Sequence, residues 1–281
     1  MPSRRKLDIL ILSDIHLGTF GCHAAELNAY LKTVKPQTLI LNGDIIDMWQ
    51  FNKYYFPASH IKVLKRIIGF VSEGTEVYYL TGNHDDNLRR FTDLHMGNFH
   101  LSDKLLISIG NKKAWVFHGD VFDLTMKYSK VVARLGSIGY NTLIFLNRAI
   151  NKLSMMAGYG KVSLSKKIKD SVKSAIKFID DFETTATDLG IESGYDFVIC
   201  GHIHRPVIKR VTNKNGSIMY LNSGDWIENL TALEFSNGEW TLFQYDEKDF
   251  INSAENEAEE ENTSAIPAVQ FEDMILQQLR L

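Results

Sequence analysis

Short apolar runs alternate with amphipathic segments through the first half of the chain. Short apolar runs bounded by turn residues are typical of buried strands, and apolar positions that recur every three to four residues are typical of helices. The strand pattern occurs at residues 7–12, 39–41, 77–80, 114–117 and 197–200. Helical spacing occurs over residues 25–34 and 61–72. This alternation predicts an α/β fold.

Three later apolar segments have the composition of strands. They cover residues 218–221, 230–235 and 240–245. Because they follow the alternating part of the chain and lie close together in sequence, we expect them to form a second sheet.

Residues from about 122 to 195 interrupt the alternation, since their spacing is helical throughout. We interpret them as an inserted helical cap. Residues 124–178 hold eleven Lys or Arg and one acidic residue, Asp170, a balance of about +10, whereas the whole chain carries −3. Basic and apolar side chains together favour contact with a phosphate-bearing lipid or the inner surface of an anionic membrane. The alternative is that the apolar stripe packs on the domain and the lysines face solvent.

The composition is that of a globular protein, with 44% hydrophobic and 23% charged residues among 281. One domain over residues 1–250, interrupted by the cap, is predicted, followed by an acidic tail over 251–281 that we expect to be disordered apart from a short terminal helix. Two cysteines without metal or redox spacing fit a reduced, cytoplasmic protein. The apolar run at residues 7–12 is too short for a signal or a membrane span.

Five polar motifs follow apolar runs or contain glycine. They are Asp14-Ile15-His16, Gly43-Asp44, Gly82-Asn83-His84-Asp85, Phe117-His118-Gly119-Asp120 and Gly201-His202-Ile203-His204. Their carboxylate, imidazole and amide groups, without cysteine, favour Mn, Fe, Ni or Zn in an open site over structural zinc. Two such ions about 3.5–4 Å apart clamp the attacking and leaving oxygens of an in-line displacement at phosphorus. The motifs therefore predict a two-metal phosphohydrolase.

In order and spacing, these motifs resemble the calcineurin-like metallophosphoesterase superfamily. The resemblance implies a two-sheet α/β sandwich and two divalent cations, with Mn²⁺ as the first choice. The ligands that it implies are Asp14, His16 and His204 for one ion, Asn83, His118 and His202 for the other, and Asp44 as the bridge.

The same resemblance assigns catalysis to the third motif. His84 is similar to the superfamily's catalytic histidine, which contacts the phosphate and protonates the leaving group. Asp85 is expected to hold His84 or a ligand in orientation, and Asp47 and Asp120 are further candidates for such a supporting role.

The length, the position of the insertion and the continuation of the last motif as Arg205-Pro206 resemble the UDP-2,3-diacylglucosamine pyrophosphatases of lipid A synthesis, over residues 7–245. This implies a lipid-linked nucleotide diphosphate as substrate, UMP and a lipid monosaccharide 1-phosphate as products, and a lid that holds acyl chains. One departure is His84, where the best-known members of that family have arginine. An imidazole and a guanidinium bind phosphate differently, so another phosphodiester or nucleotide remains the alternative substrate.

Three further hypotheses compete with this one. A soluble phosphodiesterase or phosphatase would act on a small polar substrate. A nuclease would use the basic cap to follow a backbone, but the cap is rich in aliphatic residues instead of stacking aromatics, so no nucleic-acid partner is expected. A metal-free scaffold is disfavoured because none of the expected ligands is missing.

Overall fold

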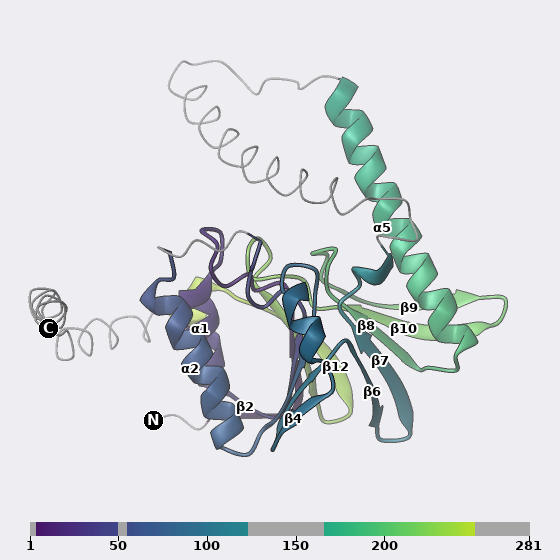
Figure 1. Cartoon of the computed structure of the whole chain (residues 1–281). Helices are drawn as coiled ribbons and strands as arrows, with labels where there is room; N and C mark the ends of the chain where they lie inside the picture. The colour runs from purple at the N-terminus through teal and green to yellow at the C-terminus, as the bar shows by residue number, and fades with distance from the viewer. Residues whose placement is uncertain (1–3, 50–54, 123–165, 251–281) are drawn as a thin grey trace, which may run out of the picture.

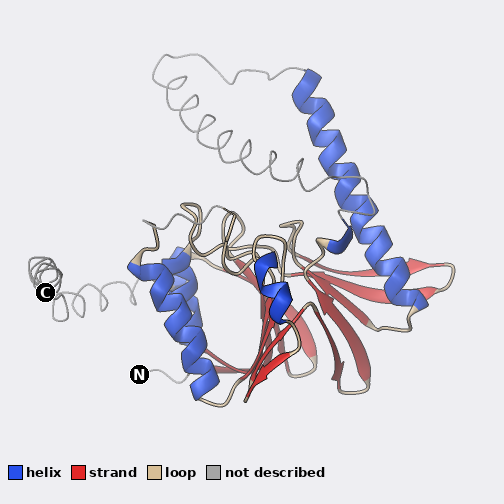
Figure 2. Cartoon of the chain, viewed as in Figure 1, coloured by secondary structure: helices blue, strands red, loops and turns tan. Residues whose placement is uncertain are grey.

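The computed structural model describes residues 4–49, 55–122 and 166–250. Figures 1 and 2 show the layers in order: helices, a large sheet, a smaller sheet, and a long helix on the outer face of the smaller sheet. The fold is the two-sheet α/β sandwich that the family resemblance implied.

The large sheet has seven strands in the order β12-β11-β1-β2-β3-β5-β4. The strands are β1 (Arg5–Leu12), β2 (Val34–Asn42), β3 (Glu76–Leu80), β4 (Leu94–Met96), β5 (Phe99–Ser102), β11 (Thr231–Ser236) and β12 (Glu239–Gln244). Strands β1, β2, β3 and β5 are parallel to one another. Helices α1 (Ala24–Thr33) and α2 (Ala58–Ser72) connect the first three of them.

The small sheet has five strands in the order β6-β7-β8-β10-β9. They are β6 (Lys104–Ile109), β7 (Lys112–Phe117), β8 (Phe197–Cys200), β9 (Val207–Asn213) and β10 (Gly216–Asn222), with β7, β8 and β10 parallel. Helix α5 (Lys166–Glu192) packs on this sheet. Two short 3₁₀ helices, η1 (Asp86–Phe91) and η2 (Glu247–Asp249), also belong to the described part of the chain.

Strand β1 shows why the predicted strands read as continuous apolar runs. Leu10 and Leu12 join the core between the large sheet and helices α1 and α2, whereas Ile9 and Ile11 join the core between the two sheets. Successive side chains of a strand point to opposite faces, so a strand that is covered on both faces needs apolar residues at every position.

The assignment of the last two predicted strands to the second sheet was wrong. Of the three late strands, only β10 belongs to the small sheet. Strand β11 pairs antiparallel with β1, placing Phe235 opposite Ile9, and β12 follows at the edge. An apolar run identifies a strand but not its partner, because the partner depends on where the chain crosses. Strands β4, β5, β6 and β9 were not predicted.

Helix α5 accounts for the last part of the predicted cap. Its C-terminal part packs on the small sheet, where Phe182 and Ala186 join a core with Val198 and Tyr220. Figure 1 shows the N-terminal part projecting beyond the sheets. Residues 123–165 of the predicted cap and the predicted tail over 251–281 lie outside the described residues. In the described ranges, no helix is both long and apolar enough to cross a bilayer.

Candidate metal centre

The candidate ligands follow the carboxyl ends of parallel strands from both sheets. Asp14 and His16 follow β1, Asp44 follows β2, His118 follows β7, and His202 follows β8. Because the two sheets pack face to face, their loops meet at one edge, where α/β sheets place their ligands.

The backbone at five of these residues adopts the left-handed conformation. The φ angles are 52° at Asp14, 54° at His16, 54° at Asp44, 67° at His202 and 48° at His204. They make up five of the eight non-glycine residues with positive φ in the described part of the chain. Such conformations persist only where the surrounding structure enforces them, and they concentrate at functional sites.

One group of ligand atoms combines both sheets. Asp14, His16 and His204 each offer an atom within 4.8 Å of the other two. The Nε2 of His204 lies 3.0 Å from Oδ1 of Asp14, and Oδ2 of Asp14 accepts a hydrogen bond of 3.0 Å from the backbone N–H of His202. The motif that carries His202 and His204 therefore fixes the carboxylate of Asp14.

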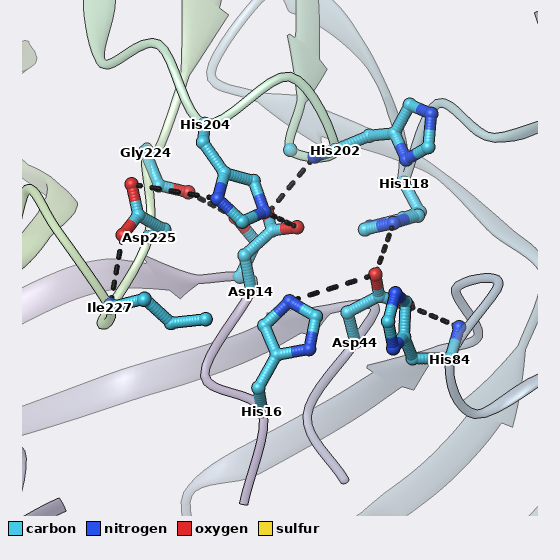
Figure 3. A network of polar contacts seen from close by, with 12 residues as sticks. Asp14, His16, Asp44, His84, His118, His202, His204, Gly224, Asp225 and Ile227 are labelled. Carbon is cyan, nitrogen blue, oxygen red and sulfur yellow. Dashed lines mark hydrogen bonds and ion pairs between the residues drawn. The ribbon is translucent and has the colours of Figure 1, made fainter. Parts of the chain in front are cut away.

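A second group consists of Asp44, His118 and His202, again within 4.8 Å of one another. Nδ1 of His118 donates to the carbonyl oxygen of Asn42 over 2.9 Å, so Nε2 is the ring nitrogen that faces Asp44 Oδ2, 3.2 Å away. The same Oδ2 lies 3.9 Å from Nε2 of His16. Figure 3 shows Asp44 between the two histidines, where a bridging ligand is needed.

Four of these atoms show that the residues fit divalent cations. They are Oδ1 of Asp14, Nε2 of His16, Oδ1 of Asn83 and Nε2 of His118, all buried and without a well-oriented hydrogen bond among the described residues, although Asp14 Oδ1 and His118 Nε2 each lie near another ligand atom. Buried polar atoms are almost always paired, so a cluster of unpaired ones requires a partner. Carboxylate, imidazole and amide oxygen are ligands of Mn, Fe, Ni and Zn.

The carboxylates of the site are ionised at neutral pH. Burial alone would raise the pKa of Asp14, but His204 and His118 overcome it and lower that pKa to about 2. Burial is likewise outweighed at Asp44, whose pKa is held well below its usual value by His118, His16 and His84. Both groups are therefore anionic before any cation binds.

His84 lies beside the two ligand groups. Its Nδ1 is 2.9 Å from Oδ2 of Asp47, its backbone N–H donates to Oδ1 of Asp44 over 2.8 Å, and Trp49 stacks on its ring at 4.3 Å. Burial lowers the pKa of His84, but the hydrogen bond with Asp47 and the charge of Asp44 prevail and raise it. His84 forms a third group with His16 and Asp44, because their ligand atoms also lie within 4.8 Å of one another.

The three supporting aspartates take different places. Oδ2 of Asp47 lies between His84 and Nδ1 of His16, which is 3.3 Å away. Asp85 accepts hydrogen bonds from the backbone N–H groups of Ile45 and Gly82 and from the hydroxyl of Tyr79, so it ties together the loops that carry Asp44 and Asn83. Asp85 does not belong to the three ligand groups.

Asp120 pairs with an arginine. Its Oδ2 accepts from the guanidinium of Arg89 over 2.7 Å, and Nε of Arg89 donates to Thr81 over 3.2 Å. This contact links the segment after His118 to the segment after His84.

Asp225 is a candidate supporting residue that the sequence analysis missed. It is fully buried, and its Oδ2 lies 3.9 Å from Nδ1 of His204 and 2.5 Å from the side-chain amide of Asn229, which also bonds the carbonyl of His204. A signal was present, because Asn222-Ser223-Gly224-Asp225 follows an apolar run just as Asn42-Gly43-Asp44 does.

Asp225→Asn is expected to weaken binding of the cation at His204. Removing a group that orients a ligand typically lowers metal affinity 10–100-fold. Asparagine keeps Oδ1, which accepts from the backbone of Ile227 and Glu228, so the loop should keep its shape. Titration with Mn²⁺ by calorimetry should show one of two sites weakened; equal affinity at both sites in the variant would contradict this role.

Gly82→Ala is expected to damage the site through a direct clash. A Cβ at Gly82 would lie 2.2 Å from Oδ1 and 2.6 Å from the backbone nitrogen of Asp44. We expect loss of metal and of most activity in a folded protein. Gly69→Ala is the control, because a Cβ there meets nothing within 4 Å and alanine favours helix α2. Normal metal content in Gly82→Ala would show that Asp44 tolerates displacement.

The fold and the paired ligand groups define a metal-dependent phosphoesterase. The profile of the calcineurin-like phosphoesterases matches residues 7–206, and the chain belongs to this family. The resemblance inferred from the motifs is thereby confirmed.

Several relatives are similar over most of their length. The UDP-2,3-diacylglucosamine hydrolase of Aeromonas salmonicida (strain A449) is 26% identical over 243 residues, which cover 85% of this chain and 93% of the relative. The hydrolase of the same name from Shewanella loihica (strain ATCC BAA-1088 / PV-4) is 25% identical over 238 residues, covering 83% and 94%. A solved archaeal phosphodiesterase aligns at 16% identity with a TM-score of 0.41, covering 84% of this chain and 99% of its own.

Proposed function

We propose that this phosphoesterase hydrolyses UDP-2,3-diacylglucosamine to UMP and a lipid monosaccharide 1-phosphate. The observation that carries the chemistry is Asp44, whose carboxylate lies between two groups of ligand atoms. The substrate is supported by relatives named for this hydrolysis, which align over more than four fifths of the chain.

In this proposal, Asp14, His16 and His204 would hold one cation, and Asn83, His118 and His202 would hold the other, with Asp44 shared. Two divalent cations, proposed to be Mn²⁺, would supply positive charge for activation of water and for stabilisation of charge on the phosphate. Asp47 keeps the His84 imidazole oriented, and His84 donates a proton to the leaving phosphate oxygen. Asp85 positions the two loops that carry Asp44 and His84.

The helical cap over about 122–195 is proposed to hold the acyl chains. Its helix α5 reaches the second ligand group, since the ring of Phe182 lies 6.3 Å from that of His202 and packs against Gly119, next to His118. The same proposal places the enzyme in the cytoplasm, in contact with the inner membrane surface through the basic residues of the cap.

The test compares three substrates in Mn²⁺: UDP-2,3-diacylglucosamine, UDP-glucosamine without acyl chains, and bis-p-nitrophenyl phosphate. Rapid release of UMP from the acylated substrate alone supports the proposal and assigns acyl binding to the protein. Activity on the generic diester alone would reject the lipid substrate and favour another phosphodiester. Metal analysis of the protein purified without added metal tests the choice of Mn²⁺ over Fe, Ni or Zn.

A further inference from the structure

The loop after His16 exposes an aromatic ring close to the metal centre. Phe20 is 88% exposed, the largest fraction among the large apolar side chains of the described residues. A phenyl ring exposed to this extent keeps most of its apolar surface in water and is available for contact with a ligand. Its one stacking partner among the ring contacts of the described residues is Tyr55, with centroids 5.0 Å apart and planes 21° from parallel.

The position of Phe20 relative to the site is fixed by hydrogen bonds. The backbone N–H and the hydroxyl of Thr19 both donate to the carbonyl oxygen of His16, at 3.1 and 2.9 Å. This closes a turn, so the Cα atom of Phe20 lies no more than about 11 Å from that of the ligand His16. These two bonds fix the backbone that precedes Phe20, and the ring itself is held by stacking on Tyr55.

The other half of the ring pair is held by a buried histidine. His60 of helix α2 is 2% exposed, and its Nδ1 accepts a hydrogen bond of 2.9 Å from the backbone N–H of Gly18. The edge of its ring packs against Tyr55 with centroids 6.0 Å apart. One side chain thus fixes both the loop that carries Phe20 and the ring beneath it.

Phe20 and helix α5 lie on opposite sides of the centre. The loop of Phe20 packs on the side of the first ligand group, since a Cβ at Gly21 would lie 3.3 Å from Ile227, next to Asp225. Helix α5 contacts the second group through Phe182. In Figure 1, α2, which carries His60, and α5 stand on opposite flanks of the loops between them. A substrate with two different arms on a central diphosphate matches this arrangement.

We propose that the exposed face of Phe20, backed by Tyr55, is the stacking platform for the pyrimidine base of a nucleotide substrate. This platform rests on the proposed function only because it requires a nucleotide substrate. The acyl chains of the substrate would lie on the side of helix α5. A flat pair of parallel rings offers a third ring the same offset stacking, which a flexible alkyl chain does not exploit. A ribose separates base from α-phosphate, and the limit of about 11 Å between the Cα atoms of Phe20 and His16 is compatible with that span.

The test measures binding of UMP and ribose 5-phosphate to the Mn²⁺-loaded full chain by calorimetry. We expect wild type to prefer UMP and Phe20→Ala to lose roughly 5- to 150-fold in UMP affinity, the range for one stacked base, with ribose 5-phosphate unchanged. Phe20→Trp should keep the preference, and Phe20→Leu, which keeps apolar area without a ring, should not. Phe91→Ala is the control, because Phe91 is 51% exposed but lies in η1 beside Arg90.

Equal affinity of wild type for the two ligands, or an unchanged preference in Phe20→Ala, would overturn the platform. The platform would also be overturned if Phe20→Ala raised the KM for an acylated substrate and left UMP affinity unchanged, since Phe20 would then contact the acyl chain. The outcome is separable from the proposed function: UMP binding through Phe20 without hydrolysis of UDP-2,3-diacylglucosamine would keep the platform and reject the lipid substrate.

Discussion

Asp44→Ala is expected to release both metal ions together and to lower phosphoesterase turnover by more than roughly 10²-fold, which is the upper range for loss of a supporting contact alone. The reason is that Asp44 belongs to two ligand groups at once, one with His16 and His84 and one with His118 and His202. Its Oδ2 is the atom that faces both His16 and His118. The measurement is metal content per chain after dialysis, with Mn²⁺ titration by calorimetry.

Two variants separate bridging from folding. Asp44→Asn keeps the volume and an oxygen that accepts the backbone N–H of His84, so it should preserve the loop while weakening both cations. Asp196→Ala removes a carboxylate that accepts from the backbone of Lys113 at the far end of β8, and it should leave metal content unchanged. A folded Asp44→Ala protein that keeps one cation at full occupancy would contradict the bridging role.

The strands that position the site were predictable from the sequence, and the reason is physical. Strands β1, β2 and β8 are covered on both faces, so they read as unbroken apolar runs ending in polar motifs. Parallel strands present their carboxyl ends at a common edge, so polar residues at those ends meet even when they are far apart in sequence. This is why seven predicted site residues fall into the three ligand groups.

The features that were missed depend on tertiary contacts. Strand β4 is three residues long and exposed throughout, so it lacks the burial that makes a strand readable. The strand order that places β11 beside β1 depends on the route of the chain after Asn222. Asp225 was missed because its partner His204 lies 21 positions earlier, within a different motif.

The left-handed backbone conformation of the candidate ligands could also not be predicted from the local sequence. Positive φ is uncommon for any residue other than glycine, so the sequence did not indicate it at His16 or His202. At Asp14 the conformation is stabilised from outside, because its backbone N–H donates to Gly43 and its carbonyl accepts from Trp226. The site therefore stores local strain that the packing of both sheets offsets.

His84→Ala is expected to keep both cations and to lower kcat by roughly 10²–10⁴-fold, the usual contribution of a positioned acid or base. The structural basis is that Nδ1 of His84 lies at Asp47 and its ring is stacked on Trp49, whereas the two ions have ligands enough in Asp14, His16 and His204 and in Asn83, His118 and His202, with Asp44 shared. Metal content and kcat are measured on the same preparation. Equal loss of metal would show that His84 is a ligand, as its proximity to His16 and Asp44 allows.

The pH dependence distinguishes a proton donor from a phosphate contact. Because Asp47 and Asp44 raise the pKa of His84 against burial, its protonated form persists above the ordinary value of about 6.5, and activity that needs this proton falls as pH rises through the raised pKa. Bound cations favour the neutral imidazole and therefore oppose this rise in the pKa of His84. Asp47→Asn, assayed at saturating Mn²⁺, removes a charge that raises the pKa, so the alkaline fall should move to lower pH. An alkaline fall that persists unchanged in His84→Ala would assign the proton to another group and leave His84 as a phosphate contact.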